Sequence, residues 1–173
     1  MAPKIYLTVG ISGSGKSKFA KVWAKATNSI EINADDIRKS LGDISSQENE
    51  YLVWKEVDRK TIAHLAGGDN IILSNTNLHL RGINELRKKF PFNEINLFIM
   101  DDSTNIDLCK ERIKKDLKNG VERSNVPMEV VDKQFMNFIN LILELRKGLP
   151  LNPLNVKATI VKTDFSLEPF ETE

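Results

Sequence analysis

Short apolar stretches alternate with longer amphipathic stretches along the whole chain. The short stretches are rich in Ile, Val and Leu and predict strands at residues 4–9, 30–33, 71–74, 95–100 and 158–161. The stretches between them predict helices at residues 16–27, 35–41, 47–66, 81–90, 104–119 and 128–147. This alternation is typical of a parallel sheet whose strands are joined by crossover helices. We therefore predict an α/β fold in a single domain over residues 1–173.

The last predicted helix has the clearest apolar face. Its large apolar residues recur at steps of three and four, which places them on one side of a helix. They are Val131, Phe135, Phe138, Ile142 and Leu145. We interpret this face as packed against the core. Residues 149–155, which are rich in Pro and Asn, predict a loop, and we expect residues 163–173 to form a loose tail.

Composition narrows the class of protein. The 173 residues carry a formal net charge of +1, so a nucleic-acid surface can only be a local patch. Cys109 is the single cysteine, which excludes an internal disulfide and any CxxC motif, and we interpret it as a core residue. The apolar run near the N-terminus is too short for a signal-peptide core or a membrane span. We expect a cytoplasmic protein without membrane contact.

The most specific motif is the glycine-rich segment at residues 10–17, which fits G-x-x-x-x-G-K-[ST] and lies between a predicted strand and a predicted helix. Its glycines allow backbone N–H groups to turn toward a phosphate, and the helix that follows adds its positive dipole end. We expect Lys16 to contact the β- and γ-phosphates and the Ser17 hydroxyl to bind Mg²⁺. The predicted nucleotide-binding residues are Gly10, Ile11, Ser12, Gly13, Ser14, Gly15, Lys16 and Ser17.

A phosphate-binding loop alone does not distinguish a kinase from a GTPase or a motor ATPase. The sequence has no DxxG after a middle strand and no NKxD, which argues against a GTPase. Motor ATPases usually need a larger domain. A small phosphotransferase is the interpretation that the sequence favours.

A second motif follows the second predicted strand, at the edge of the sheet where the phosphate loop lies. Phosphoryl transfer to an alcohol requires a carboxylate that accepts the hydroxyl proton and cations that hold the moving charge. Asp35 and Arg38 are three residues apart and share one face of a helix. The alternative is that Asp35 or Asp36 only caps this helix.

Four segments, in this order, resemble the kinase domain of phage polynucleotide 5′-hydroxyl kinases. They are LTVGISGSGKS at residues 7–17, INADDIR at 32–38, IILSNTNL at 71–78 and, more loosely, CKER at 109–112 with Val126-Pro127. The resemblance implies a P-loop kinase fold, with a five-stranded parallel sheet and a mobile helical lid. It further implies transfer of the γ-phosphate of ATP, with Mg²⁺, to the 5′-hydroxyl end of DNA or RNA. Asp35 would then be the general base, and Arg38 would hold the acceptor.

The sequence departs from the family in three places. The DxDGT motif of the family phosphatase is absent, so we expect no phosphatase activity. Asn75 stands where the kinases have a strand-end aspartate, and an amide does not attract cations as a carboxylate does. In the lid, expected at about residues 109–127, Asp116 takes the place of a phosphate-clamping arginine. Lys115, one position earlier, or Arg123, if the loop is longer, could replace it, and we favour Arg112 and Arg123 as the lid cations.

Other features leave alternatives open. We interpret Tyr51 and Trp54 as core residues, with base stacking at an acceptor channel as the alternative. Asp101 and Asp102 are expected to cap and begin the helix that follows, rather than to bind a metal. A nucleoside, nucleotide, sugar or modified base could replace the polynucleotide acceptor. A non-catalytic nucleotide-binding module is a further alternative, and the oligomeric state is not predicted.

Overall fold

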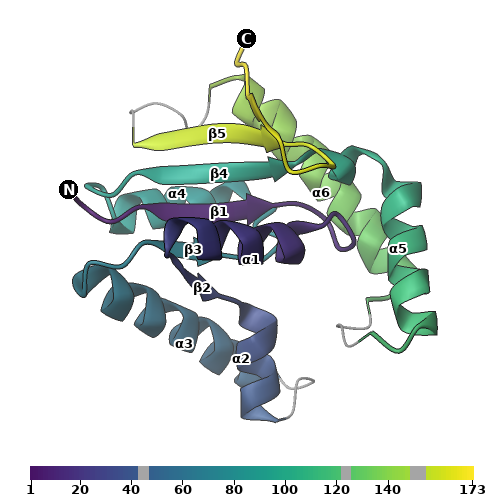
Figure 1. The fold of residues 1–173 in the computed structure, drawn as a ribbon, viewed down its shortest axis with the longest axis horizontal. Coiled ribbons are helices and arrows are strands. Elements are labelled where there is room, and N and C mark those ends of the chain that lie inside the picture. The colour runs from purple at the N-terminus through teal and green to yellow at the C-terminus, as the bar shows by residue number, and fades with distance from the viewer. Residues whose placement is uncertain (43–46, 122–125, 149–154) are drawn as a thin grey trace.

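The computed structural model describes residues 1–42, 47–121, 126–148 and 155–173, and within this part of the chain it forms one twisted sheet between helices (Figure 1). The strand order is β2-β3-β1-β4-β5-β6. The strands are β1 (Ile5–Val9), β2 (Ile30–Ile32), β3 (Ile71–Leu73), β4 (Ile95–Met100), β5 (Val156–Val161) and β6 (Leu167–Pro169). The helices are α1 (Lys16–Thr27), α2 (Ala34–Leu41), α3 (Gln47–Ala66), α4 (Leu80–Lys89), α5 (Ile106–Lys118) and α6 (Met128–Arg146), with a 3-10 turn, η1 (Asp101–Thr104), before α5.

The predicted strands and helices are confirmed, with boundaries that differ by at most two residues. Successive residues of β1 point to opposite faces of the sheet, as strand geometry requires. Ile5, Leu7 and Val9 pack into the larger core cluster, together with residues of every helix except α1. Tyr6 belongs to a second cluster on the opposite face, where Phe19 of α1 packs. The sheet is therefore covered by α1 on one face and by the other helices on the second face.

The sheet has six strands where five were predicted. Five strands are parallel, and β6 pairs antiparallel with β5. The expectation of a loose tail at residues 163–173 is therefore wrong for β6. A tight turn reverses the chain, because the Phe165 N–H donates to Lys162 O at 2.8 Å and Phe165 has a φ of +66°. The Ser166 N–H and hydroxyl both donate to Asp164 Oδ1, which fixes the turn locally.

The first turns of α2 and α5 begin on asparagine caps. Asn33 Oδ1 accepts from the Asp35 N–H at 2.8 Å and from the Asp36 N–H at 3.2 Å. The alternative that Asp35 or Asp36 caps this helix is therefore wrong, and both carboxylates remain available for other contacts. Asn105 Oδ1 caps α5 by accepting the Leu108 N–H. The expectation that Asp101 and Asp102 cap α5 is wrong as well, because they form the separate 3-10 turn η1.

No helix among the described residues is long and apolar enough to span a membrane.

Glu94 links the strands on both sides of β4. Its carboxylate forms ion pairs with Lys4, which precedes β1, and with Lys157 of β5. The hydrogen bond from the Lys157 ammonium is the main cause that lowers the pKa of Glu94 from 4.5 to about 2. Asn96 and Lys4 lower this pKa further, whereas burial of the carboxylate raises it. A carboxylate with a depressed pKa stabilises the folded state above its unfolded pKa, and this stabilisation is lost as the pH falls toward the folded pKa.

Glu94→Gln is accordingly expected to lower the free energy of unfolding by about 1 kcal/mol at pH 7, a value reduced by solvent screening of the partly exposed lysines. Urea unfolding of the two proteins should give a constant difference above about pH 5.5. The difference should shrink as the pH falls from 4.5 toward 2, the unfolded and folded pKa values of this carboxyl. A difference that is independent of pH would contradict the role of this charge.

Candidate active site

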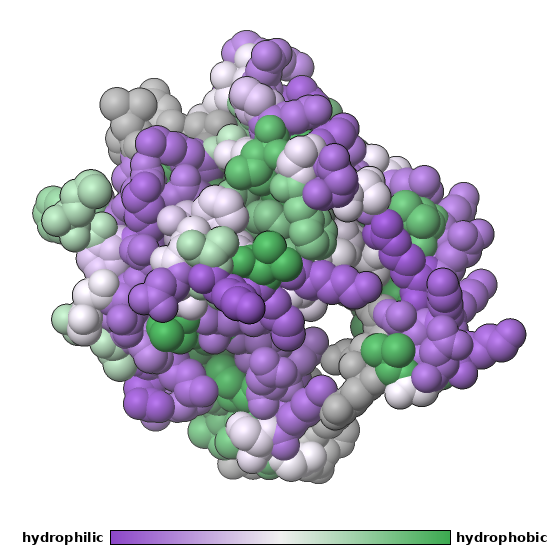
Figure 2. Space-filling model, viewed as in Figure 1, coloured by the Kyte–Doolittle hydropathy of each residue, from purple (hydrophilic) through white to green (hydrophobic). Residues whose placement is uncertain are grey.

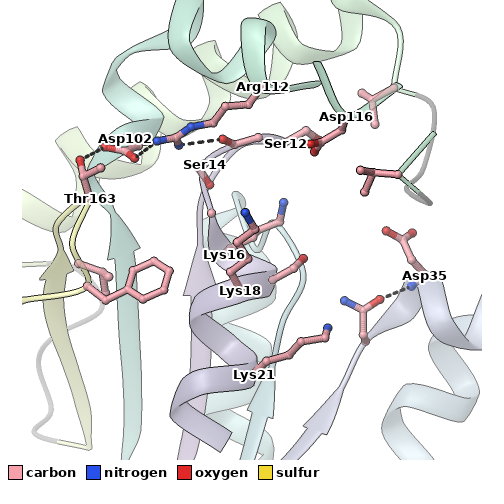
Figure 3. Close-up of a pocket in the computed structure, with 18 of the residues that line it drawn as sticks. Ser12, Ser14, Lys16, Lys18, Lys21, Asp35, Asp102, Arg112, Asp116 and Thr163 are labelled. Carbon is pink, nitrogen blue, oxygen red and sulfur yellow. Dashed lines mark hydrogen bonds and ion pairs between the residues drawn. The ribbon is translucent and has the colours of Figure 1, made fainter. Parts of the chain in front are cut away.

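A cavity of about 880 Å³ lies at the carboxyl ends of the parallel strands. Its lining comes mainly from the phosphate loop with the first turns of α1, from α2, from α5 and from the hairpin between β5 and β6, and Asn33, Asp102, Val121 and Val126 complete it. Figure 3 shows the phosphate loop between Thr163 on one side and Asp35 on the other. A ligand of the loop and a ligand of Asp35 would therefore share one cavity.

The phosphate loop is held from outside by side chains that are distant in sequence. The Ile11 N–H donates to Ser103 Oγ at 3.1 Å, and the Ser12 N–H donates to Gln134 Oε1 at 2.9 Å. Gly13 has a φ of +82°, and a Cβ at this position would lie 2.4 Å from the carbonyl oxygen of Cys109 in α5. Only glycine fits here, because the backbone conformation and the close approach of α5 both exclude a side chain.

The loop leaves the groups expected of an anion site facing the cavity. Gly15, in the left-handed conformation, begins α1 without a side-chain cap, so no side chain of the N-cap competes with a ligand for the first N–H groups of the helix. The Lys16 Nζ lies 3.4 Å from Ile11 O, curled over the loop. The buried Ser14 hydroxyl has no hydrogen-bond partner among the described residues. These features fit a bound polyphosphate, and the exposed Ser17 hydroxyl at the helix start suits a Mg²⁺ ion next to it.

Gly13→Ala is expected to lower the free energy of unfolding by about 2 to 4 kcal/mol, because it adds a clash with backbone to a strained φ. Gly68→Ala is the matched control, since Gly68 has a φ of +88° but a Cβ added there would meet nothing within 4 Å. The control should cost only about 1 kcal/mol. Urea denaturation measures both values, and equal losses would show that the contact between Gly13 and α5 has no special role.

Asp35 lines the cavity from the first turn of α2, with half of its side chain exposed. Arg38 Nη1 donates to Asp35 Oδ1 at 2.6 Å. The same guanidinium donates from Nε and Nη2 to the two carboxylate oxygens of Glu50 in α3, at 3.0 and 2.6 Å. Hydrogen bonds to Glu50 raise the pKa of Arg38, and Arg38 in turn lowers the pKa of Glu50. Arg38 thus orients the Asp35 carboxylate, and Glu50 fixes Arg38.

Arg38 does not itself line the cavity, although the sequence predicts that it holds the acceptor. Its side chain is 22% exposed and lies 6.0 Å from the ring centre of Trp54. The bidentate pair with Glu50 directs its guanidinium toward α3. In this conformation the structure brings together Asp35, Lys16 and Ser17 in the cavity and places Arg38 behind Asp35.

Asn75 supports the start of α2. Its Oδ1 accepts the Ala34 N–H at 2.9 Å, directly beside the Asn33 cap. A neutral amide oxygen serves this role without a cation. The asparagine therefore fixes the backbone next to Asp35.

Tyr51 and Trp54 are not core residues, so that expectation is wrong. Their exposed fractions are 68% and 44%. The buried face of α3 instead carries Val53, Val57 and Thr61, which recur at steps of four. Trp54 Nε1 donates to Glu50 Oε1 at 3.0 Å, which ties the ring to the partner of Arg38.

Some of the residues that the sequence predicts for the lid line the cavity. Arg112 of α5 donates to Gly13 O at 3.1 Å and forms an ion pair with Asp102 of η1 at 2.9 Å (Figure 3). Lys115 and Asp116 of the same helix also line the cavity. Arg123, the second predicted lid cation, lies outside the described residues.

Cys109 is fully buried, as expected for a core residue. Burial raises the pKa of its thiol to about 11, so the thiolate that would react or bind a metal is disfavoured. The described residues contain no cluster of His, Cys, Asp and Glu that could hold a metal ion on its own.

Comparison with protein families gives one match that includes the phosphate loop. A family model described as an AAA domain matches residues 5–141. The chain belongs to this AAA domain family. The matched range runs from β1 through most of α6 and includes both the phosphate loop and Asp35. No curated protein sequence matches the chain significantly.

Solved structures show that this AAA domain has the fold of P-loop kinases. One chain of the Pnkp1/Rnl/Hen1 RNA repair complex matches with a TM-score of 0.73 and 22% identity, over 99% of this chain and 49% of that chain. This AAA domain therefore spans about half the length of its counterpart in the complex. A gluconokinase from Sinorhizobium meliloti 1021 matches with a TM-score of 0.55 and 17% identity, over 92% of this chain and 83% of that chain. A sugar kinase from Janibacter sp. HTCC2649 matches with a TM-score of 0.60 and 18% identity, over 92% of this chain and 85% of that chain.

Several residues of this AAA domain line the cavity although no motif indicated them. Lys18 and Lys21 come from α1, Lys39 comes from α2, and Thr163 and Phe165 come from the hairpin after β5. Lys18 and Lys21 are three residues apart, so helix geometry places them on one face of α1, and this spacing is a signal that the sequence contains. The position of the hairpin residues has no such signal, because contacts with distant residues place them: β5 pairs with β6, Thr163 donates to Asp102, and Phe165 packs on Phe19.

Proposed function

We propose that this protein is an ATP-dependent polynucleotide kinase that transfers the γ-phosphate of ATP to the 5′-hydroxyl end of DNA or RNA. The observation that carries the proposal is that the phosphate loop and the Asp35 carboxylate line one cavity. A hydroxyl placed between a triphosphate on the loop and this carboxylate would be in position for transfer.

On the donor side, the N–H groups at the start of α1 and the Lys16 ammonium would hold the β- and γ-phosphates of ATP. Ser17 would help to hold Mg²⁺, which neutralises charge on the phosphates when it is bound. Arg112 of α5 and Arg123, which lies outside the described residues, are the candidates for further cations on the phosphates. Arg112 already contacts the phosphate loop through Gly13 O, so it needs to exchange little more than its bond to Asp102 to contact a phosphate.

On the acceptor side, Asp35 would act as general base. The 5′-oxygen attacks the γ-phosphorus, the bond from phosphorus to the β,γ-bridging oxygen breaks, ADP leaves, and the hydroxyl proton passes to the Asp35 carboxylate. Arg38 holds one oxygen of this carboxylate, which leaves the other oxygen to accept the proton. In this account Arg38 positions the base, and Glu50 holds Arg38 in place.

The likeness to a chain of an RNA repair complex over 99% of this protein supports a nucleic-acid end as acceptor. The second candidate is a kinase for a sugar or nucleoside hydroxyl, which the folds of the gluconokinase and the sugar kinase support. Salt distinguishes the two acceptors. A polyanionic acceptor held by several cations loses affinity steeply as the salt concentration rises, whereas a neutral sugar or nucleoside does not.

The test is transfer of labelled γ-phosphate to a panel that contains 5′-hydroxyl DNA and RNA oligonucleotides, nucleosides, gluconate and other sugars. The same oligonucleotides with a 5′-phosphate are the matched control. We expect label on the 5′-hydroxyl oligonucleotides and none on the 5′-phosphorylated ones. Label only on a small acceptor would replace the proposal with the second candidate, and hydrolysis or binding of ATP without any labelled acceptor would overturn both.

A further inference from the structure

The cavity lining has a larger net positive charge than the chain as a whole. Its lining includes seven cationic side chains and four carboxylates, whereas the net charge of the whole chain is only +1. The cations are Lys16, Lys18, Lys21, Lys39, Arg112, Lys115 and Lys162, and the carboxylates are Asp35, Asp36, Asp102 and Asp116. Figure 2 shows a hollow between the regions of α2 and α5 whose described border is largely hydrophilic.

The seven cations line different parts of the cavity. Lys16, Arg112 and Lys115 surround the phosphate loop, where a triphosphate would lie. Lys162 comes from the hairpin after β5 and forms an ion pair with Asp101. The remaining three, Lys18, Lys21 and Lys39, line the cavity from α1 and from α2, the helix that carries Asp35. The donor alone therefore does not account for this charge.

Lys18 and Lys21 form a short row on one face of α1. They are three residues apart on the helix, which separates their Cβ atoms by about 5 to 6 Å. In Figure 3 they follow Lys16 down α1, and Lys21 extends toward the turn that carries Asp35. Lys39 faces the same cavity from α2. A row of this kind matches a ligand with several phosphates in succession better than a ligand with one.

The lysines are placed where a flexible strand can reach them. Lys18 forms no ion pair with any described residue, and its side chain is exposed. The Lys21 side chain is 69% exposed, and its ammonium lies 3.9 Å from Glu31, a solvated pair of small energy. The Glu31 carboxylate also accepts a hydrogen bond from the Ser74 hydroxyl at 2.8 Å, so it keeps a partner when Lys21 turns away.

We propose that Lys18, Lys21 and Lys39 bind successive backbone phosphates of a single nucleic-acid strand whose 5′-hydroxyl end lies at Asp35. The inference rests on the proposed function and deepens it, because it assigns residues that favour a strand over a nucleoside or sugar. Contacts to phosphate carry no base information, so this part of the site binds strands of any sequence.

The experiment compares Lys18→Gln/Lys21→Gln with Lys25→Gln. Lys25 is an exposed lysine one turn further along α1 that does not line the cavity, so it controls for a general loss of positive charge. Binding of a 3′-fluorescent, 5′-hydroxyl oligonucleotide is followed by anisotropy from 50 to 300 mM salt. Each phosphate contact to a single strand contributes about 0.7 to the slope of log affinity against log salt. The double variant should lower the slope by about 1.4 and Lys39→Gln by about 0.7, while Lys25→Gln should leave it unchanged.

Steady-state kinetics and ATP affinity distinguish a failure of the lysine assignment from a failure of the proposed function. We expect the double variant to raise KM for the oligonucleotide about tenfold, with kcat, the KM for a small 5′-hydroxyl acceptor and the affinity for ATP unchanged. An unchanged salt slope, or a loss of ATP affinity equal to the loss of oligonucleotide affinity, would overturn the assignment of these lysines while leaving the proposed kinase intact. Failure of the unmodified protein to phosphorylate any oligonucleotide would overturn the proposed function itself.

Discussion

Asp35→Asn should lower kcat for phosphoryl transfer by about 10² to 10⁴, the usual contribution of a general base, and leave the affinity for ATP within about twofold. The amide keeps the shape of the carboxylate but cannot accept the hydroxyl proton. The fold should be unaffected, because Arg38 keeps both hydrogen bonds to Glu50 and the Asp35 N–H keeps its cap on Asn33. Initial rates with labelled ATP and titration calorimetry measure the two quantities.

Asp36→Asn is the matched control for this prediction. Asp36 is the neighbouring carboxylate, also lines the cavity, and accepts no hydrogen bond from Arg38. Its substitution should change kcat by no more than a few-fold. Equal effects of the two substitutions, or a loss of ATP affinity that matches the loss of rate at Asp35, would show that Asp35 is not the base.

Lys16→Ala should have the second large effect and should act on the donor. Removing a cation that holds charge on the transferring phosphoryl group is expected to cost about 10² to 10³ in kcat and to weaken ATP binding as well. The Lys16 ammonium lies over the loop and donates to Ile11 O at 3.4 Å, so the substitution removes this hydrogen bond together with the positive charge. Lys25→Ala on the same helix is the control. Normal turnover by Lys16→Ala would contradict the interpretation of the loop as a phosphate site.

The elements that the sequence predicts best are those whose signal is local. Strands such as β4 and helices such as α6 are encoded by apolar periodicity within one segment, so their bounds agree with the structure within two residues. The strand β6 was missed because it is only three residues long and exposed, and it exists through pairing with β5. Trp54 was misplaced because one residue along a helix changes the face, and Val53 occupies the buried position instead.

In the candidate site, too, the residues that the sequence predicts are those with a local signal. The phosphate loop and Asp35 follow from motifs whose residues are close in sequence. The groups that hold them come from distant segments, as with Gln134 of α6 on the loop and Glu50 of α3 on Arg38. No spacing rule connects such partners, because tertiary packing alone brings them together. The sequence therefore predicted candidate groups that line one cavity, and the structure added the side chains that hold them in place.

A structure of the protein with a non-hydrolysable ATP analogue, Mg²⁺ and a 5′-hydroxyl oligonucleotide would show whether Asp35 faces the acceptor hydroxyl. Under the proposed function, the analogue lies on the loop at residues 10–17 and the terminal 5′-oxygen lies within about 3 Å of an Asp35 carboxylate oxygen, in line with the γ-phosphate. An oligonucleotide end bound elsewhere, or an Asp35 carboxylate that stays turned from the 5′-oxygen when both ligands are bound, would contradict it.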